Sequence, residues 1–320
     1  MADGSEEAPW RRSAHEGPDS PYAGVPPGST SDAGGPDYRT LTYEVDGRVA
    51  RLTFNRPDHG NAITLDTPVE LAAAVERADL DPRVHVIVLS GRGKGFCGGY
   101  DLGAFAEQAI PNHDPSKTWD PMVDYAMMSR FTKGYASLLH ANKPTVAKIH
   151  GFCVAGGTDI ALHCDQIVIA ADAKIGYPPT RVWGVPSAGL WAHRLGDQRA
   201  KRLLLTGNCL SGREAAEWEL AIEAPEPKNL DARTEDLVQR IAVMPLNQLM
   251  MVKLALNSAL LAQGVQNSQM MISTVFDGIS RHTREGYSFA ARAAEVGFKN
   301  AVRERDAAPY DDFGPSTNKG

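Results

Sequence analysis

Residues 84–102 read VHVIVLSGRGKGFCGGYDL, and residues 145–159 repeat the same pattern as TVAKIHGFCVAGGTD. Each stretch begins with a short apolar run rich in β-branched residues, which is typical of a strand covered on both faces. Each run leads into a glycine-rich segment that ends in an acidic residue, Asp101 in the first stretch and Asp159 in the second. Strands that alternate with helices in this way predict an α/β core with parallel pairing.

The glycines at these junctions of strand and helix indicate a chemical use. Without side chains to cover them, backbone N–H groups are open to the close approach of an anionic oxygen. Two such donors form an oxyanion hole, with which a protein stabilises an enolate or a tetrahedral oxyanion on a carbonyl substrate. The two glycine-rich segments therefore predict carbonyl chemistry.

Local patterns predict the elements around these segments. Residues 41–45 and 49–54 read as strands, and Asp46-Gly47 between them is a hairpin turn signal. The sequence Thr67-Pro68-Val69-Glu70 combines a capping Thr, a Pro at the first helical position and a Glu three residues after the cap. It predicts a helix from Thr67 to about Asp79. Further predictions are a helix over 158–164, a buried strand over 165–170, and mostly helical chain from Arg199 onward.

Composition excludes several classes of function. The 320 residues are 42% apolar, which suffices for a large core, and the formal charge is −6 at pH 7. With no basic stripe, this acidic balance argues against a nucleic-acid partner. No apolar run approaches the ~20 residues of a membrane helix, and the first residues resemble neither a signal peptide nor a transit peptide. We therefore expect a cytoplasmic protein without a membrane partner.

The composition also changes along the chain. Residues 1–37 are rich in Gly, Pro, Ser and Asp without apolar periodicity. They predict a disordered N-terminal arm, because such a segment buries too little surface to offset its conformational entropy. We expect the α/β core over 38–225, a helical C-terminal subdomain over 226–306, and a flexible tail over 307–320.

The four cysteines, Cys97, Cys153, Cys164 and Cys209, lack the spacing of a zinc site. We therefore expect reduced thiols and no metal. Cys97 and Cys153 lie inside the glycine-rich segments, so a nucleophilic role is one alternative. The favoured interpretation is that a small apolar side chain is needed beside a tight turn.

Taken in order, the motifs resemble the crotonase superfamily, the enoyl-CoA hydratase/isomerase family. The resemblance runs from about Tyr38 to about Arg305, and the order and spacing of its motifs are specific as a set. These motifs are Asn55-Arg56-Pro57, Asn61-Ala62, Phe96 to Leu102, Lys143 to Val146, Gly151, Gly156-Gly157, Cys164-Asp165, Ile175-Gly176, Thr206-Gly207 and Ala215 to Glu217. The resemblance implies a crotonase-like spiral of ββα units with a helical C-terminal region used in trimer formation, often within a hexamer.

The resemblance further implies an acyl-CoA substrate, as in fatty acid metabolism, with no cofactor beyond the coenzyme A of that substrate. By analogy, the thioester oxygen accepts hydrogen bonds from the backbone N–H groups of Gly98 and Gly156. The helix that begins near Gly157 adds its dipole at the same oxygen. The expected contacts of the coenzyme A part are Ala62, Gly99, Tyr100, Asp101 and Leu102, with Lys94 near the phosphates.

The sequence departs from the family pattern at the acid–base positions. Ordinary hydratases of the family hold the added water between two glutamates. The resemblance places the first at Asp159, one methylene shorter, and the second at Pro179, which cannot transfer a proton. General acid–base catalysis contributes about 10²–10⁴-fold, so the loss of one partner matters. Candidate replacements are Tyr177, Arg181, Trp183, His150, Asp120, Asp124 and Tyr125.

Several of these polar residues also have a structural interpretation. His150 ends a strand, where a histidine more often serves as a structural hydrogen-bonding group. Asp101 and Asp165 are likewise expected to anchor the backbone locally. For Asp159 the alternative is a first-turn acid that complements the helix dipole, and the catalytic interpretation is favoured.

Three functions remain open from the sequence. The leading hypothesis is an enoyl-CoA hydratase-like lyase with Asp159 as its retained acid–base group. The second is a crotonase-like C–C hydrolase, decarboxylase or lyase for a bulky or cyclic acyl-CoA. The third is a non-catalytic acyl-CoA-binding protein, because a fold can be retained after its catalytic function is lost.

Overall fold

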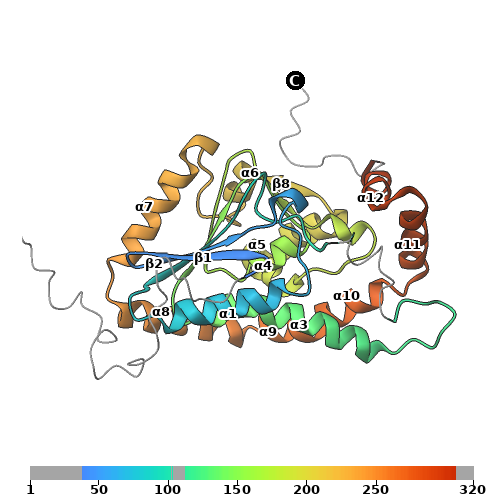
Figure 1. Ribbon diagram of the computed structural model, residues 1–320, viewed down its shortest axis with the longest axis horizontal. Coiled ribbons are helices and arrows are strands. Elements are labelled where there is room, and N and C mark those ends of the chain that lie inside the picture. Colours follow the sequence, from blue (N-terminus) through green and yellow to red (C-terminus); the bar gives the residue numbers. More distant parts are fainter. Residues whose placement is uncertain (1–37, 102, 104–111, 308–320) are drawn as a thin grey trace, which may run out of the picture.

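The computed structural model describes residues 38–101, 103 and 112–307. The predicted N-terminal arm, the predicted tail after Ala307, and Leu102 lie outside the described residues. The remaining chain forms two sheets with helices packed around them (Figure 1).

The larger sheet has five strands in the order β1-β2-β3-β4-β6. The strands are β1 (Leu41–Asp46), β2 (Val49–Phe54), β3 (Val86–Gly91), β4 (Thr145–Ile149) and β6 (Gln166–Ile169). The β1–β2 hairpin is antiparallel, with Asp46 opposite Val49, and all other pairs are parallel. The predicted hairpin and parallel core are thus confirmed. The strand predicted from Val84 begins two residues later, because His85 and Val86 donate to the Arg48 carbonyl before the regular ladder starts.

A second, smaller sheet begins within the second glycine-rich segment. It pairs β5 (Phe152–Val154) with β7 (Lys174–Gly176) in parallel and β7 with β8 (Cys209–Ser211) antiparallel. Three-residue strands are too short to show a period-2 pattern, which is why the sequence did not reveal this sheet. Helix α4 (Gly156–Ala161) begins after β5, with Ala155 between them. It is shorter than the predicted 158–164 helix and starts two residues earlier.

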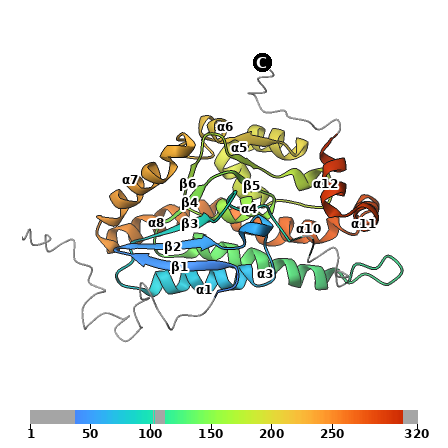
Figure 2. The ribbon, with the colours of Figure 1, turned by 45° about the horizontal axis from the view of Figure 1, so that its top comes forward.

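Helices cover both faces of the larger sheet (Figures 1 and 2). The helices α1 (Thr67–Leu80) and α3 (Pro121–His140) pack side by side on one face, and α7 (Leu230–Ala242) packs against β3, β4 and β6. Helix α1 starts at Thr67 as predicted. The predicted capping box is wrong, because the Glu70 carboxylate accepts from Thr40 instead and the Thr67 hydroxyl accepts from the Thr64 N–H.

The chain from Arg199 onward is mostly helical, as predicted, although the first of these helices begins earlier, at Ala188. Its helices are α5 (Ala188–Thr206), α6 (Gly212–Glu217), α7, α8 (Leu246–Ala262), α9 (Val265–Asn267), α10 (Thr274–Ser280), α11 (Arg284–Val296) and α12 (Phe298–Ala307). A π-helical turn, η6 (Ser268–Ser273), joins α9 to α10, and 3-10 turns occur at η3 (Pro57–His59), η4 (Pro178–Arg181) and η5 (Pro227–Asn229). Helix α10 packs against α3, while α11 and α12 lie together at one end of the molecule (Figure 2).

The hydrophobic core lies between the larger sheet and its helices. It contains the inward faces of β2, β3, β4 and β6, together with Phe96, Phe131 and Trp191. No helix within the described ranges is both long and apolar enough to cross a membrane. The two glycine-rich segments emerge from β3 and β4, which are neighbours in the sheet.

Candidate active site

The two glycine-rich segments run beside each other as the sequence predicted. The Phe96 and Cys97 N–H groups donate to the Phe152 carbonyl, at 2.9 and 3.2 Å, and the Val154 N–H donates to the Cys97 carbonyl at 3.0 Å. On its other side the first segment pairs with the chain around Ile63, whose N–H donates to the Gly99 carbonyl at 2.8 Å. The first segment is therefore the middle of three extended chains.

The close approach of the segments requires glycine at position 99. Gly99 has a φ of +93°, a conformation that side-chain-bearing residues rarely adopt. A Cβ there would lie 2.6 Å from the Ala155 Cβ and 3.4 Å from the Gly156 nitrogen. The backbones of the two segments thus meet beside the start of α4.

The two predicted oxyanion donors have different surroundings. The Gly98 N–H donates to the Gly60 carbonyl at 2.9 Å, so it points toward the outer chain and not toward Gly156. Gly156 is the first residue of α4 and follows Ala155, which has a φ of 54°. No acceptor for the Gly156 N–H occurs among the described residues, as expected for the first amide of a helix.

The pairing with Ile63 shows which amide of the first segment faces Gly156. Ile63 exchanges hydrogen bonds with the Gly99 carbonyl and the Asp101 N–H, at 2.8 Å each. In a parallel pair of this kind, the residue between these two partners directs its own amide to the opposite side. That residue is Tyr100, and the opposite side holds residues 153–156.

Asp159 lies in the first turn of α4 and is buried, with 6% of its surface exposed. Its Oδ1 accepts from the Ser187 N–H at 2.9 Å. Burial raises the pKa of Asp159 to about 7, and the nearby charge of Asp277 acts in the same direction, while hydrogen bonds from Ser187 oppose the shift. Both protonation states are therefore accessible near neutral pH, as an acid–base group requires.

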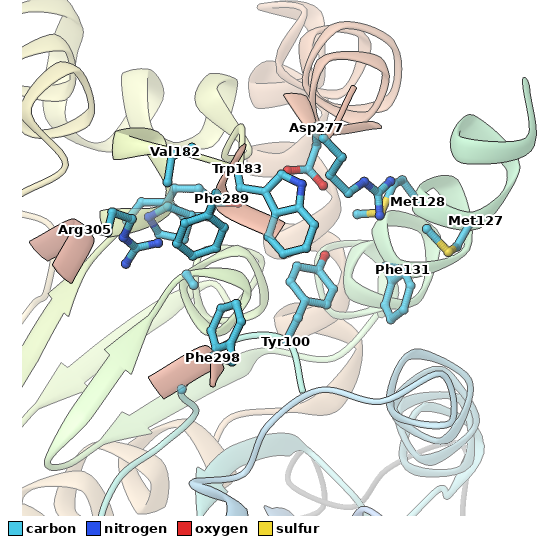
Figure 3. A pocket seen from close by; sticks show the side chains of 15 residues that line it. Tyr100, Met127, Met128, Phe131, Val182, Trp183, Asp277, Phe289, Phe298 and Arg305 are labelled. Carbon is cyan, nitrogen blue, oxygen red and sulfur yellow. The ribbon is translucent and has the colours of Figure 1, made fainter. Parts of the chain in front are cut away.

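A cavity with an empty volume of about 750 Å³ opens beside the first glycine-rich segment (Figure 3). Its walls include Tyr100, Phe131, Trp183, Phe289 and Phe298, with Met127 and Met128 beside them. Trp183 has a φ of 78° and its ring packs 5.6 Å from that of Phe289. The walls are thus mainly aromatic, and they come from the glycine-rich segment, α3, the loop after η4, and the C-terminal helices.

A smaller, polar cavity with an empty volume of about 300 Å³ adjoins the first. Tyr100, Met128, Tyr177 and Asp277 line both. Asp159 lines the smaller one together with Ser187. Asp159 therefore lies beside the wall that the polar cavity shares with the aromatic one.

Some of the predicted site residues meet at these cavities. Gly98, Tyr100, Tyr177, Pro179 and Trp183 line the aromatic cavity, and Asp159 lines the polar one. The sequence missed the residues contributed by the C-terminal helices, because no local pattern connects them to the glycine-rich segments. These residues are Asp277, Arg281, Phe289, Phe298 and Arg305.

Other candidates have structural contacts elsewhere. His150 bonds the Gly93 carbonyl through Nε2 at 2.8 Å, in keeping with its structural interpretation. Arg181 forms an ion pair with Asp306 of α12 at 3.1 Å, away from the cavity lining. Asp124 is buried in a polar cluster with Trp119, His282 and Arg281. Asp120 caps α3, and Tyr125 is not among the described residues that line the cavity.

Of the predicted coenzyme A contacts, Ala62 and Asp101 are joined through Arg56 on the outer side of the first segment, while Tyr100 lines the cavities and Leu102 lies outside the described residues. Arg56 donates to the Ala62 carbonyl at 2.6 Å and forms an ion pair with Asp101 at 2.7 Å, so Asp101 anchors the loop as expected. Asp165 is also structural, since its carboxylate accepts from the Thr145 N–H at 2.7 Å and pairs with Lys253 at 2.9 Å. Lys94 is exposed.

The cysteines are not nucleophiles in this arrangement. Cys97, Cys153 and Cys164 are buried free thiols. Burial raises the pKa of Cys97 to about 12 and that of Cys153 well above its usual range, so neither forms the reactive thiolate at neutral pH. The burial of Cys97 and Cys153 agrees with their interpretation as small side chains beside tight turns, and the Cys97 thiol donates to the Asn61 carbonyl at 3.2 Å.

Comparison with known proteins agrees with this geometry. The chain matches the enoyl-CoA hydratase/isomerase family over residues 44–293, which include both glycine-rich segments and most of the helices that close the cavity. It belongs to this family. The predicted superfamily and crotonase-like fold are confirmed.

Individual members of the enoyl-CoA hydratase/isomerase family are similar over most of their length. A probable enoyl-CoA hydratase of Rhizobium meliloti is 29% identical over 82% of this chain and 99% of its own. The 1,2-epoxyphenylacetyl-CoA isomerase of Escherichia coli is 29% identical over 68% of this chain and 82% of its own. A crystal structure of an enoyl-CoA hydratase from Mycobacterium smegmatis is 68% identical, covers 84% of this chain and 94% of that one, and gives a TM-score of 0.80.

Proposed function

We propose that this member of the enoyl-CoA hydratase/isomerase family is a lyase that adds water to an enoyl-CoA. The observation that carries the proposal is the position of Gly156 and Asp159, one turn apart on α4, where Ala155 just before the helix lines the aromatic cavity and Asp159 lines the adjoining polar one. In the addition, a base takes a proton from water while the hydroxyl binds Cβ. The displaced electron pair forms an enolate at the thioester oxygen, and an acid then protonates Cα.

The enolate oxygen is held by the N–H groups of Gly156 and Tyr100. This assignment replaces Gly98, whose N–H donates to Gly60, by the residue whose amide faces the second segment. Gly156 opens α4, so the helix dipole adds positive potential at the same point. Removal of one such donor typically costs about 3 kcal/mol of transition-state stabilisation.

The coenzyme A part of the substrate lies along the backbone of Ala62, Gly99 and Asp101, with Lys94 close to the phosphates. The supporting observation is that Arg56 fixes the Ala62 carbonyl and Asp101 relative to each other. No cofactor beyond coenzyme A is required by this chemistry.

A second candidate is lyase, hydrolase or isomerase chemistry on a bulky or cyclic acyl-CoA. The aromatic walls favour it, because Trp183, Phe289 and Phe298 offer flat surfaces to a ring. The relative from Escherichia coli bears the name of an isomerase of a phenyl-substituted acyl-CoA. The third candidate, acyl-CoA binding without turnover, differs from both in having no product.

A product screen separates the three candidates. The wild-type protein is incubated with crotonyl-CoA, cinnamoyl-CoA, a cyclic β-keto acyl-CoA and malonyl-CoA, and products are identified by liquid chromatography with mass spectrometry. We expect hydration of at least one of the two enoyl-CoA substrates. Cleavage of the cyclic or malonyl thioester without hydration would favour the second candidate, and micromolar binding without any product would favour the third.

We also propose a homo-oligomer, a trimer or a hexamer. Helix α8 supports this proposal, because Met251, Val252, Leu254 and Leu256 are between 48% and 66% exposed on it. Apolar side chains gathered on one helix typically mark an interface. Light scattering should therefore give the mass of three or six chains, and a monomer mass would contradict the proposal.

A further inference from the structure

Asp277 is a half-buried acid that the mechanism above does not use. It lies on α10 and lines the aromatic cavity (Figure 3). It also lines the polar cavity, as Asp159 on α4 does. Pro179, at the position of the missing second acid, lines the aromatic cavity too. An acid from a distant helix therefore shares the space that a side chain at position 179 faces.

One segment of chain holds both acids. The Val185 N–H donates to Asp277 Oδ1 at 2.8 Å, and the Ser187 N–H donates to Asp159 Oδ1 at 2.9 Å. Two residues of chain span at most about 7 Å, so the two donors are no farther apart than that. The two carboxyl groups are thus held by the same short stretch of chain, and both line the polar cavity.

Asp277 lacks the ion pair that would keep it charged. The nearby guanidinium of Arg281 pairs with Asp124, at 3.3 Å, and no ion pair of Asp277 occurs within the described residues. Burial raises the pKa of Asp277, which Arg281 and the Val185 N–H only partly oppose. The charge of Asp277 also raises the pKa of Asp159, the direction in which neighbouring carboxyl groups come to share one proton.

The other titratable groups that face the pair do not compete with it. The groups near Asp159 are Tyr100, Tyr135, Tyr177 and Cys97. The groups from the C-terminal helices are Arg281 and Arg305. Burial raises the pKa of each of these tyrosines well above its usual range. These tyrosines therefore stay uncharged near neutral pH.

From this arrangement we infer that Asp277 is the second catalytic acid–base residue, acting as a pair with Asp159 in place of a glutamate at position 179. The inference rests on the proposed hydration. The ionised member of the pair accepts a proton from water as the hydroxyl binds Cβ, and the protonated member donates its proton to Cα. The pair holds one proton before and after the addition, and exchange with solvent restores its original placement.

The test compares Asp277→Asn with the wild type and with Glu285→Gln. Asparagine keeps an oxygen that can accept from the Val185 N–H, so the loop retains its anchor. Glu285 is an exposed acid of α11 outside both cavities, so its variant is a control for the loss of one carboxylate. Hydration of crotonyl-CoA and cinnamoyl-CoA is followed between pH 5 and pH 9, and butyryl-CoA binding is measured by calorimetry.

We expect the wild type and Glu285→Gln to show a bell-shaped pH profile, because both fully protonated and fully ionised pairs are inactive. Asp277→Asn should lose at least about 100-fold in kcat. It should bind butyryl-CoA within about threefold of the wild type, and its remaining activity should lose one limb of the bell. Asp277→Glu should regain part of kcat.

Two results would overturn the inference. If Asp277→Asn keeps kcat within fivefold and retains the bell, Asp277 is not a proton donor or acceptor, and the proposed hydration stands without it. If the wild type hydrates neither substrate at any pH, the proposed hydration is wrong, and the assignment of Asp159 and Asp277 as its acid–base pair is wrong as well. The same variants thus show which of the two ideas has failed.

Discussion

Asp159→Asn should reduce turnover of an enoyl-CoA by about 10²–10⁴-fold, the range expected for the loss of a general acid–base group. Acyl-CoA binding should stay within a few-fold, because the oxyanion donors and the aromatic walls are untouched by the change. Asparagine also keeps an oxygen for the Ser187 N–H, which now bonds Asp159 Oδ1. Steady-state kinetics and calorimetry with butyryl-CoA measure the two quantities separately.

The stability of this variant provides its control. The pKa of Asp159 is about 7 in the folded protein and near 3.8 in an unfolded chain. Between these values the folded state holds a proton that the unfolded state has lost, so this group makes unfolding easier as pH rises from about 4 to about 7. Asparagine does not titrate. Asp159→Asn should therefore unfold at a higher temperature than the wild type at pH 8. This difference in unfolding temperature should become smaller as the pH is lowered toward 4. Near-normal turnover at pH 8 would show that Asp159 is not the acid–base residue.

Gly99→Ala should be the most damaging change in the glycine-rich segments. The new Cβ would lie 2.6 Å from the Ala155 Cβ, and Gly99 has a φ of +93°. Relief of the contact moves the first segment away from α4, which separates the Tyr100 and Gly156 amides. We expect kcat to fall by at least about 10²-fold, the effect of losing one oxyanion donor. The free energy of unfolding should fall by about 2–4 kcal/mol through overpacking and backbone strain.

Gly47→Ala is a matched control for this variant. Gly47 lies in the β1–β2 turn with a φ of +56°, and no atom lies within 4 Å of a Cβ built there. Alanine at position 47 therefore introduces backbone strain of about 1–2 kcal/mol without a steric contact of its Cβ. Urea unfolding should show this smaller loss, with kcat unchanged. An equal loss of kcat in both glycine variants would refute the role assigned to the meeting of the two segments.

The sequence was sufficient for the parts of the fold that local patterns encode. The apolar runs before the two glycine-rich segments predicted adjacent parallel strands, and Asp46-Gly47 predicted the hairpin. The start of α1 was predicted at Thr67, but its capping was not, because Glu70 is engaged by Thr40 from the chain before β1. Contacts between segments far apart in sequence decide such details, and a local pattern does not contain them.

The same distinction holds in the site. The sequence alone indicated that Asp159 lies in the first turn of a helix that begins with glycines. The choice between the Gly98 and Tyr100 amides was not visible in the sequence, because it depends on how the segment pairs with Ile63 and Gly60. Asp277 was not visible either, because α10 must fold back against α3 before this acid reaches the cavity.

The central claim is that the two glycine-rich segments stabilise an enolate of an acyl-CoA thioester, and exchange of the α-protons of butyryl-CoA tests it most directly. Proton NMR in D₂O follows this exchange without requiring hydration, cleavage or release of a product. The wild type and Gly47→Ala should exchange the α-protons, while Gly99→Ala should be slower by at least about 10²-fold. A wild-type protein that binds butyryl-CoA and leaves its α-protons unexchanged would contradict the claim.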